Sequence, residues 1–266
     1  MRKVTVPDLT QKKAASEKIV MVTAYDAPTA ALIDASDVDV ILVGDSLGNV
    51  IQGRPNTIGV TMDEMVYHTK IVSRRTKRAL LVGDMPFMSY QASNQQALTN
   101  ASRFLKESGA ESVKLEVNEQ YLDTIGILAK AGIPVMGHIG LCPQSLHLMG
   151  GYKVQGRGEG EAHRLMRLAK DVEERGAFSL VLESIPQRLA KSITESIKIP
   201  TIGIGAGPHC DGQVLVFHDL IGLTEEPMPR FVKKYANVRE VMLKALAEFS
   251  REVKEGTFPG QEHYYD

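Results

Sequence analysis

The sequence is poor in cysteine and has neither a long hydrophobic run nor an excess of one charge. Cys142 and Cys210 are the only cysteines among 266 residues. The chain therefore offers no disulfide framework, and we expect a cytoplasmic protein with reduced thiols. No apolar run reaches the ~18 residues of a transmembrane helix, so we expect no membrane span. The formal net charge is −1, which leaves no basic excess for binding nucleic acid.

What the sequence does contain is a series of eight short, largely apolar runs. A run that is apolar at nearly every position is typical of a strand buried on both faces of a parallel sheet. The predicted strands are Ile19–Tyr25, Val38–Asp45, Ala79–Asp84, Ser112–Glu116, Ile133–His138, Ser179–Glu183, Ile199–Gly205 and Val214–His218.

Helical patterns lie between these runs. Capping-box patterns at Thr61–Glu64 and Ser93–Gln96 predict two helix starts. The segments Glu119–Ala131 and Glu161–Arg175 are each followed by a glycine, which is typical of a helix end. Strand and helix alternating around eight strands predict an α/β fold, a (β/α)8 TIM barrel.

Both ends of the chain add helical segments to this barrel. An N-terminal helix over Pro7–Lys18 is expected to cover the barrel floor. Apolar residues at helical spacing from Val238 to Val253 predict a packed amphipathic helix, the eighth, which Gly256 ends. No low-complexity linker interrupts the chain, so residues 1–266 are expected to form one domain. A doubly wound sheet is the rival fold, but residues 24–28 lack the G-x-G-x-x-G turn that it needs.

One four-residue phrase occurs twice. Residues 42–45 and 81–84 both read Leu-Val-Gly-Asp, so two successive apolar runs end in an aspartate. The carboxyl ends of barrel strands carry the active site in enzymes of this fold. Asp45 and Asp84 would then lie side by side and offer hard oxygen ligands to a divalent cation, for which we expect Mg²⁺.

Polar residues also end the neighbouring predicted strands. Lys114 and Glu116 are two positions apart and therefore lie on the same side of their strand. His138 ends the fifth strand, Glu183 the sixth and His218 the eighth, and Asp219 follows directly. Charges at positions normally filled by Val, Ile and Leu must be paired or metal-bound to offset desolvation. The gathering of so many charged residues at neighbouring strand ends predicts an active site there.

Charge balance suggests a role for each group. Glu116 is a third metal ligand or the partner of a metal-bound water. Lys114 and Ser46 are suited to hold a substrate carboxylate. Glu183 lies across the pocket from the metal ligands and is the candidate general base. Such a site could generate an enolate from a 2-oxo acid bound to the metal through its keto and carboxylate oxygens.

Each of these residues also has a purely structural explanation. Asp45 could be the N-cap of the next helix, and Lys114 with Glu116 could form a structural ion pair. His138 fits a hydrogen-bonded pocket residue better than a metal ligand. The glycine-rich residues 203–207 could bind a phosphate or simply turn the chain.

Several stretches in order along the chain resemble one enzyme family, the ketopantoate hydroxymethyltransferases. These enzymes add a one-carbon unit to 3-methyl-2-oxobutanoate on the way to pantothenate. The stretches are residues 21–26, 43–48, 83–87, 113–116, 136–141, 182–183, 202–207 and 210–216 with His218-Asp219.

The resemblance implies a (β/α)8 barrel with Mg²⁺ held by Asp45 and Asp84, and with Glu116 in or next to the coordination sphere. It implies that Ser46 and Lys114 meet the carboxylate of 3-methyl-2-oxobutanoate. His138 is placed with them among the substrate-binding residues, together with the two aspartates.

The resemblance also implies the reaction. Glu183 would remove the C3 proton, and the enolate would attack the methylene carbon of 5,10-methylenetetrahydrofolate. The products would be 2-dehydropantoate and tetrahydrofolate. Relatives form large cyclic homo-oligomers, often decamers, so a homodecamer or another cyclic homo-oligomer is expected.

Two other functions compete with this one. Another enolate-forming barrel, such as a carbon–carbon lyase or a phosphoenolpyruvate mutase-like enzyme, also uses Mg²⁺ and strand-end carboxylates, and Cys142 after the fifth strand fits a lyase. A non-catalytic barrel that binds a 2-oxo acid is the second. Glu183 opposite a complete metal site argues against a purely binding role.

Overall fold

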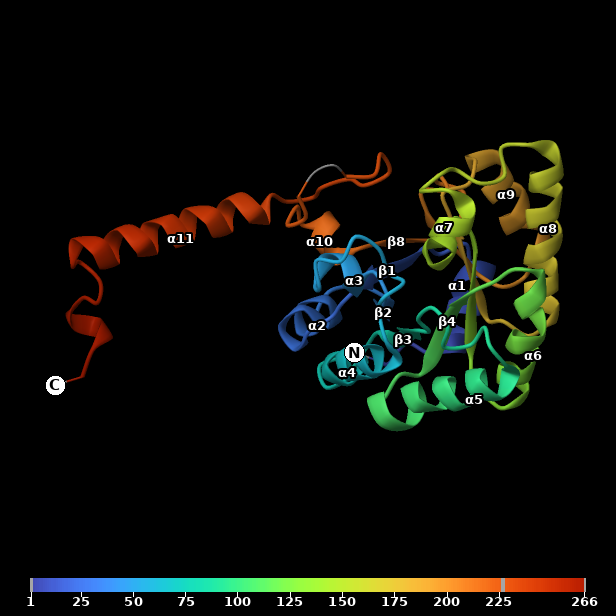
Figure 1. The fold of residues 1–266 in the computed structure, drawn as a ribbon, viewed down its shortest axis with the longest axis horizontal. Helices are drawn as coiled ribbons and strands as arrows, with labels where there is room; N and C mark the ends of the chain where they lie inside the picture. The colour runs from blue at the N-terminus through green and yellow to red at the C-terminus, as the bar shows by residue number, and fades with distance from the viewer. Residues whose placement is uncertain (1, 226–227, 266) are drawn as a thin grey trace. The chain divides into compact units, whose positions relative to one another are not determined.

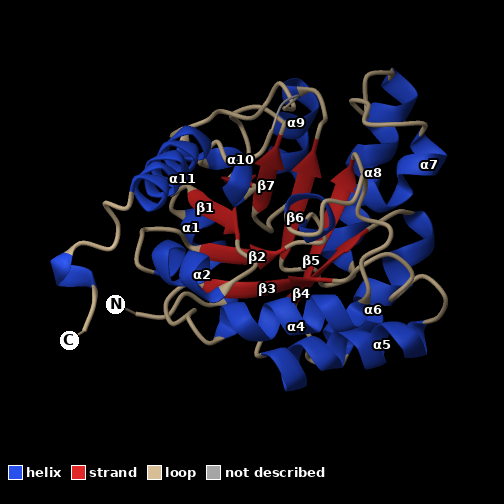
Figure 2. Cartoon of the chain, turned by 60° about the vertical axis from the view of Figure 1, so that its left-hand side comes forward, coloured by secondary structure: helices blue, strands red, loops and turns tan. Residues whose placement is uncertain are grey.

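The computed structural model describes residues 2–225 and 228–265. Its core is a closed parallel barrel in which the strands follow one another in chain order (Figures 1 and 2). The strands are β1 Ile19–Thr23, β2 Val40–Val43, β3 Leu80–Asp84, β4 Ser112–Glu116, β5 Val135–Gly140, β6 Ser179–Glu183, β7 Thr201–Ile204 and β8 Gly212–Leu215. The predicted TIM barrel is confirmed.

Helices surround this barrel, as the blue ribbons around the red strands in Figure 2 show. In the part that contains the barrel, the α-helices are α1 Val6–Ala14, α2 Ala27–Asp34, α3 Leu47–Val50, α4 Met62–Ser73, α5 Asn94–Arg103, α6 Leu122–Lys130, α7 Leu146–Met149, α8 Glu159–Glu174 and α9 Gln187–Ser196. Short π- or 3-10 turns are η1 Phe104–Ser108, η2 Glu119–Tyr121 and η3 Pro143–Ser145.

The barrel interior is packed with apolar side chains at alternate strand positions. Met21, Leu42, Val82 and Met136 belong to one buried cluster that also contains Leu9 of α1. Packing of this kind makes the barrel a filled core and not a channel. The polar groups that end the strands therefore lie above an apolar layer that keeps water from reaching them from below.

Local helix signals in the sequence act as expected at most positions. At α4, Thr61 accepts a hydrogen bond from the Glu64 backbone N–H, and the Glu64 carboxylate accepts one in return from Thr61. Ser93 caps α5 by accepting from the Gln96 backbone N–H, although the return bond of the predicted capping box is not formed there. Gly176, which follows α8, has a φ of 92°, a left-handed conformation that glycine adopts without strain.

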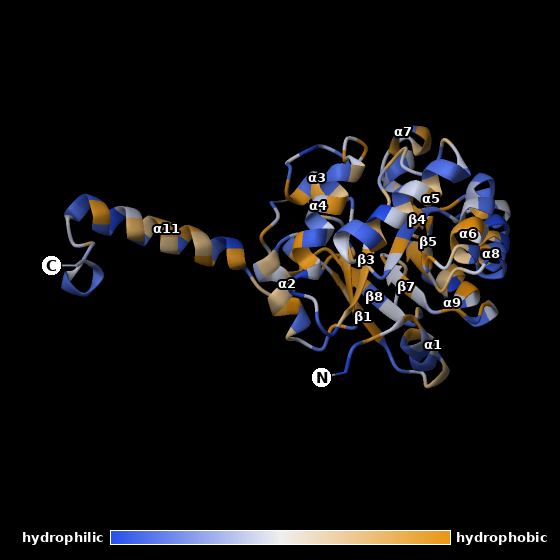
Figure 3. Ribbon diagram, turned by 90° about the horizontal axis from the view of Figure 1, so that it is seen from below, coloured by the Kyte–Doolittle hydropathy of each residue, from blue (hydrophilic) through white to orange (hydrophobic). Residues whose placement is uncertain are grey.

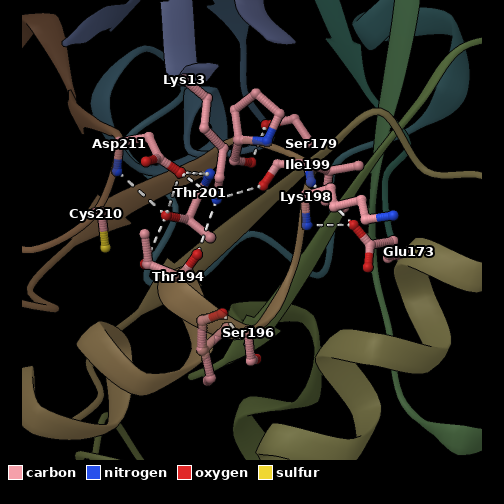
Figure 4. Close-up of polar contacts among 12 residues, drawn as sticks. Lys13, Glu173, Ser179, Thr194, Ser196, Lys198, Ile199, Thr201, Cys210 and Asp211 are labelled. Atoms are coloured by element: carbon pink, nitrogen blue, oxygen red, sulfur yellow. Dashed lines mark hydrogen bonds and ion pairs between the residues drawn. The ribbon is translucent and has the colours of Figure 1, made fainter. Parts of the chain in front are cut away.

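The N-terminal helix is tied to the loops at the amino ends of β7 and β8. Figure 4 shows Lys13 at the centre of this contact. Its ammonium group donates to the carbonyls of Thr194 and Ile199, at 2.9 and 3.0 Å, and lies 2.9 Å from Asp211 Oδ2. The same Asp211 oxygen accepts from the backbone N–H of Thr201. One lysine thus joins α1 to two separate segments of the barrel.

Replacing Lys13 by methionine should lower the free energy of unfolding by about 2–3 kcal/mol. The change leaves Asp211 and two carbonyls without a charged donor. Because the Lys13 side chain is only 15 % exposed, water replaces that donor poorly. Urea denaturation followed by circular dichroism measures the loss. Gln11→Met, on the exposed side of the same helix, is the control. Equal stability of the two variants would contradict the role given to Lys13.

The eighth strand ends earlier than the sequence suggests. Pairing of β8 with β1 stops at Leu215, opposite Val22, and pairing with β7 stops at Gln213. Without a partner strand the chain turns into a short helix, α10 Phe217–Leu220. The prediction that the eighth strand extends to His218, with Asp219 directly after it, is therefore wrong.

The chain divides into two compact units, Met1–Val216 and Phe217–Asp266. The second contains α10, α11 Val238–Glu255 and the turn η4 Gln261–His263. Helix α11 forms and ends at Gly256 as predicted, and Figure 3 shows hydrophobic and hydrophilic residues alternating along it. None of its residues is buried within its own unit, and the predicted packing of this helix stays a prediction.

In the described part of the chain, no helix is both long and apolar enough to cross a membrane.

Candidate active site

The polar residues at the strand ends continue the inward-facing positions of the barrel. Asp84 follows Leu80 and Val82 of the apolar core at the strand period of two. His138 follows Met136 in the same way, and Glu183 follows Val181. The alternation that fills the barrel below thus directs these side chains into its mouth. Strand pairing places Asp84 opposite Lys114.

Asp45, Asp84 and Lys114 form the centre of the site. The ammonium of Lys114 lies 2.8 Å from Asp84 Oδ1. The backbone N–H of Asp45 donates to the other Asp84 oxygen at 3.1 Å. The three residues are at most 6 % exposed, so the ion pair has little contact with water. The structure brings together the three residues that the sequence placed on separate strands.

Burial and crowding of negative charge change the pKa values of this acidic cluster, which we define as Asp45, Asp84 and Glu116. Burial, and next the charge of Asp45, raise the pKa of Asp84 to about 7 against the attraction of Lys114. Burial and Asp45 also raise the pKa of Glu116 well above its usual range. Burial alone would lower the pKa of Lys114, but the three carboxylates outweigh it and raise that pKa. The ammonium of Lys114 is therefore charged at neutral pH.

His138 joins Lys114 to Glu183. Its Nδ1 lies 3.4 Å from Lys114 Nζ, and its Nε2 lies 3.1 Å from Glu183 Oε2. Burial, and next the charge of Lys114, lower the pKa of His138, so the ring is neutral at neutral pH. An ammonium group can only donate, so Nδ1 accepts and the ring proton is on Nε2, facing the Glu183 carboxylate.

Glu183 itself is held by an unusual backbone. Ser184 directly after it has a φ of 48°, which is uncommon for any residue other than glycine. On the neighbouring strand, Gly140 has a φ of 98°, and a Cβ there would come within 2.3 Å of the Glu183 carbonyl oxygen. The close approach of these two strand ends therefore requires glycine at position 140.

Ser46 lies beside the cluster on the first residues of the turn into α3. Its hydroxyl forms a 2.7 Å hydrogen bond with the hydroxyl of Tyr25, which is buried at the end of β1. A Cβ at Gly44 would come within 2.8 Å of Ser46 Oγ. The glycine of the repeated Leu-Val-Gly-Asp phrase thus leaves room for this hydroxyl.

A residue that sequence reasoning missed lies against the same carboxylates. Gln144 in η3 donates from its side-chain amide to Asp45 Oδ2 at 3.0 Å, and from its backbone N–H to Glu116 Oε1 at 3.0 Å. The sequence suggested that the glycine-rich residues 140–160 form a loop over the mouth of the barrel, but it gave Gln144 itself no role. The only signal for Gln144 was its position in a loop at the carboxyl end of the barrel.

The donor set fits a hard divalent cation. In the described part of the chain, no three His, Cys, Asp or Glu side chains stand in a ready-made metal-binding arrangement, and Lys114 and Gln144 contact oxygens of Asp84 and Asp45. Three buried carboxylates nevertheless face one lysine, and the raised pKa values of Asp84 and Glu116 show that this excess of negative charge is costly. A cation with oxygen ligands would relieve it.

A cavity of about 580 Å³ adjoins the acidic cluster. Glu116, Cys142 and Gln144 form the wall shared with the cluster. The remaining wall combines aromatic and aliphatic side chains with polar ones, among them Phe87, Tyr90, Tyr121, Leu148, Met149, Glu119 and Arg164. A cavity of this size can hold a second, larger molecule beside a small substrate at the cluster.

Two solved structures with a similar fold share little sequence with this chain. Phosphonopyruvate hydrolase in complex with oxalate and Mg²⁺ has a TM-score of 0.61 at 13% identity, and covers 99% of this chain and 92% of its own. Phosphoenolpyruvate phosphomutase from Streptomyces platensis subsp. rosaceus has a TM-score of 0.63 at 14% identity, and covers 98% and 92%. These similarities support the barrel fold alone.

Curated relatives are far more similar. The 3-methyl-2-oxobutanoate hydroxymethyltransferase of Geobacter metallireducens is 52% identical over 99% of both chains. The protein of the same name from Thermotoga sp. is 56% identical over 96% of this chain and 94% of its own. The family model described as ketopantoate hydroxymethyltransferase matches residues 3–261. The chain therefore belongs to the ketopantoate hydroxymethyltransferase family.

Proposed function

We propose that the protein transfers a hydroxymethyl group from 5,10-methylenetetrahydrofolate to 3-methyl-2-oxobutanoate, in pantothenate biosynthesis. One water is consumed, and 2-dehydropantoate and tetrahydrofolate are released. The observation that carries the proposal is the arrangement of Glu183 at one end of a chain of contacts, through His138 and Lys114, that ends at the acidic cluster. A candidate base and a candidate cation-binding group thus belong to one network of contacts, as enolate chemistry requires.

The substrate carboxylate is expected to bind between Lys114 and Ser46. An ammonium group has three N–H donors, and the contacts with Asp84 and His138 account for two of them. The third can donate to a substrate oxygen. The Ser46 hydroxyl, linked to Tyr25, supplies a second hydrogen bond. Together they fix the orientation of the 2-oxo acid.

Glu183 is proposed to take the C3 proton of the bound acid. Its carboxylate is 15 % exposed and faces the N–H of a neutral His138, which orients it without giving up a proton. Mg²⁺ held by Asp45, Asp84 and Glu116 would supply the positive charge that stabilises the developing negative charge on the keto oxygen. The C3 carbon then forms a bond to the methylene carbon of the folate donor, and the bonds from that carbon to the two folate nitrogens break. The water supplies the hydroxyl oxygen of 2-dehydropantoate, and its protons together with the C3 proton complete that hydroxyl and the two N–H groups of tetrahydrofolate.

The cavity beside the cluster supports a second substrate of this size. Its aromatic wall can stack against a flat ring system, and its boundary with the cluster at Glu116 and Gln144 would bring a one-carbon group next to the reacting carbon. The related lyases and mutases use no such donor, so dependence on 5,10-methylenetetrahydrofolate separates this function from theirs.

The test is proton exchange of the substrate alone. We expect purified protein with Mg²⁺ in D₂O to remove the C3 proton signal of 3-methyl-2-oxobutanoate in the NMR spectrum, and EDTA to block the loss. If no exchange occurs, the run is repeated with tetrahydrofolate, which tests whether the folate site has to be occupied before the C3 proton is removed. Absence of exchange in both cases would refute the proposal.

A cytoplasmic location and a cyclic homo-oligomer, such as a decamer, stay predictions. Light scattering after size-exclusion chromatography measures the oligomer.

A further inference from the structure

Gln144 makes an unusual number of contacts for one polar side chain. It is 3 % exposed and lies in the loop after β5, between the acidic cluster and the cavity. Its side-chain amide nitrogen donates to Asp45 Oδ2 at 3.0 Å and to the Met85 carbonyl at 2.9 Å. Its backbone N–H donates to both oxygens of Glu116, at 3.0 and 3.2 Å. The residue therefore touches two of the three carboxylates.

The orientation of the amide group is set by its other neighbours. The Gln91 amide donates to Gln144 Oε1 at 3.2 Å, and the Tyr90 hydroxyl shares its proton between that oxygen and the Glu116 carbonyl, each 3.0 Å away. If the amide were turned over, its oxygen would face Asp45 and the Met85 carbonyl, which are both acceptors. The observed orientation is thus the one in which every partner is complementary, and it leaves an N–H donor directed at Asp45.

These contacts fix two carboxylates relative to each other. Asp45 follows β2 and Glu116 ends β4, so the strands alone do not determine how their carboxylate groups rotate. Hydrogen bonds from one residue to both remove that freedom. Outer partners of metal-ligating carboxylates act in this way, and their loss weakens metal binding about 10–100-fold.

We infer that Gln144 is a positioning residue that holds Asp45 and Glu116 in register and thereby sets the affinity of the acidic cluster for a divalent cation. The inference rests on the proposed function, which assigns a cation to this cluster. Gln144 is a neutral donor and supplies no charge of its own. Its contribution is to keep the ligand oxygens of two strands oriented before the cation arrives.

The experiment measures cation binding directly with Mn²⁺ as the probe, by the electron paramagnetic resonance signal of free Mn²⁺. Gln144→Met keeps the length of the side chain and the backbone N–H but removes the amide. We expect it to weaken Mn²⁺ binding about tenfold or more. Gln155→Met makes the same change in the loop after α7, at a residue whose side-chain amide donates to the Lys153 carbonyl. It should leave the affinity within about twofold of the wild type.

A second measurement separates positioning from a structural role. Mn²⁺ raises the melting temperature of a protein that binds it only when folded. Loss of a merely structural contact would lower the melting temperature equally with and without Mn²⁺. Loss of a positioning contact makes the rise caused by Mn²⁺ smaller. If Gln144→Met does not fold, Gln144→Asn, which is one methylene too short to reach Asp45, replaces it.

Wild-type affinity for Mn²⁺ in a folded Gln144 variant, or a full thermal shift with Mn²⁺, would overturn the inference. So would a wild-type protein that binds no Mn²⁺. A wild-type protein that binds Mn²⁺ but does not exchange the C3 proton of 3-methyl-2-oxobutanoate would refute the proposed function alone, since the comparison of Mn²⁺ affinities still tests Gln144.

Discussion

Glu183→Gln should abolish exchange of the C3 proton of 3-methyl-2-oxobutanoate, with a loss of about 10³-fold or more, as expected for removal of a positioned general base. The amide has the same shape as the carboxylate but cannot accept the proton. The contacts that hold the substrate carboxylate, Lys114 and Ser46, are untouched. Calorimetry in the presence of Mg²⁺ should therefore show that the variant still binds the 2-oxo acid.

The control for this variant is Glu174→Gln, which changes an exposed glutamate on α8 and should exchange the proton at the wild-type rate. Exchange by Glu183→Gln at the rate of this control would show that another group is the base. Loss of binding together with loss of exchange would mean that Glu183 holds the substrate and not only its proton.

Asp84→Asn should remove most of the affinity for Mg²⁺ or Mn²⁺, with a loss of about 100-fold or more. The change removes a proposed ligand and leaves the ammonium of Lys114 without the carboxylate that lies 2.8 Å from it. Calorimetric titration with Mn²⁺ measures the affinity. Asp37→Asn, at an exposed position, is the matched control and should bind as the wild type does. Equal affinities would rule out Asp84 as a ligand.

The pKa of Asp84 also predicts a pH dependence of stability. A carboxyl group whose pKa is raised in the folded state, here from 3.8 to about 7, favours the folded state when it is protonated. That contribution is complete below pH 3.8 and is lost as the pH rises through 7. Without a divalent cation, the melting temperature should therefore fall between pH 5 and 8 by several degrees, at about 2–4 °C for each kcal/mol.

Mg²⁺ should reduce this fall, because it binds the ionised carboxylates. In Asp84→Asn the fall should be smaller even without Mg²⁺, since position 84 no longer titrates. Differential scanning calorimetry at several pH values, with EDTA or with Mg²⁺, makes the comparison. A melting temperature that rises with pH in EDTA would contradict the charge balance described for the cluster.

The sequence alone predicted the barrel and the polar residues that end its strands, for physical reasons. A strand buried on both faces has to be apolar along its length, so the runs could be recognised without a partner. A charge at or near the end of such a run is conspicuous because most of the run is apolar. Asp84, Lys114, His138 and Glu183 were found for this reason, and the period of two places them in one mouth.

Tertiary structure alone decided how those groups are connected. The neutral state of His138 follows from its burial beside Lys114, and the role of Gln144 follows from contacts with residues far apart in the chain. A glutamine in a loop has no periodicity that would distinguish it. The end of β8 at Leu215 was likewise set by where its partner strands stop. The local sequence pattern predicts which face of each strand or helix is buried. Contacts between residues far apart in the chain depend on which strands and loops the closed barrel brings together.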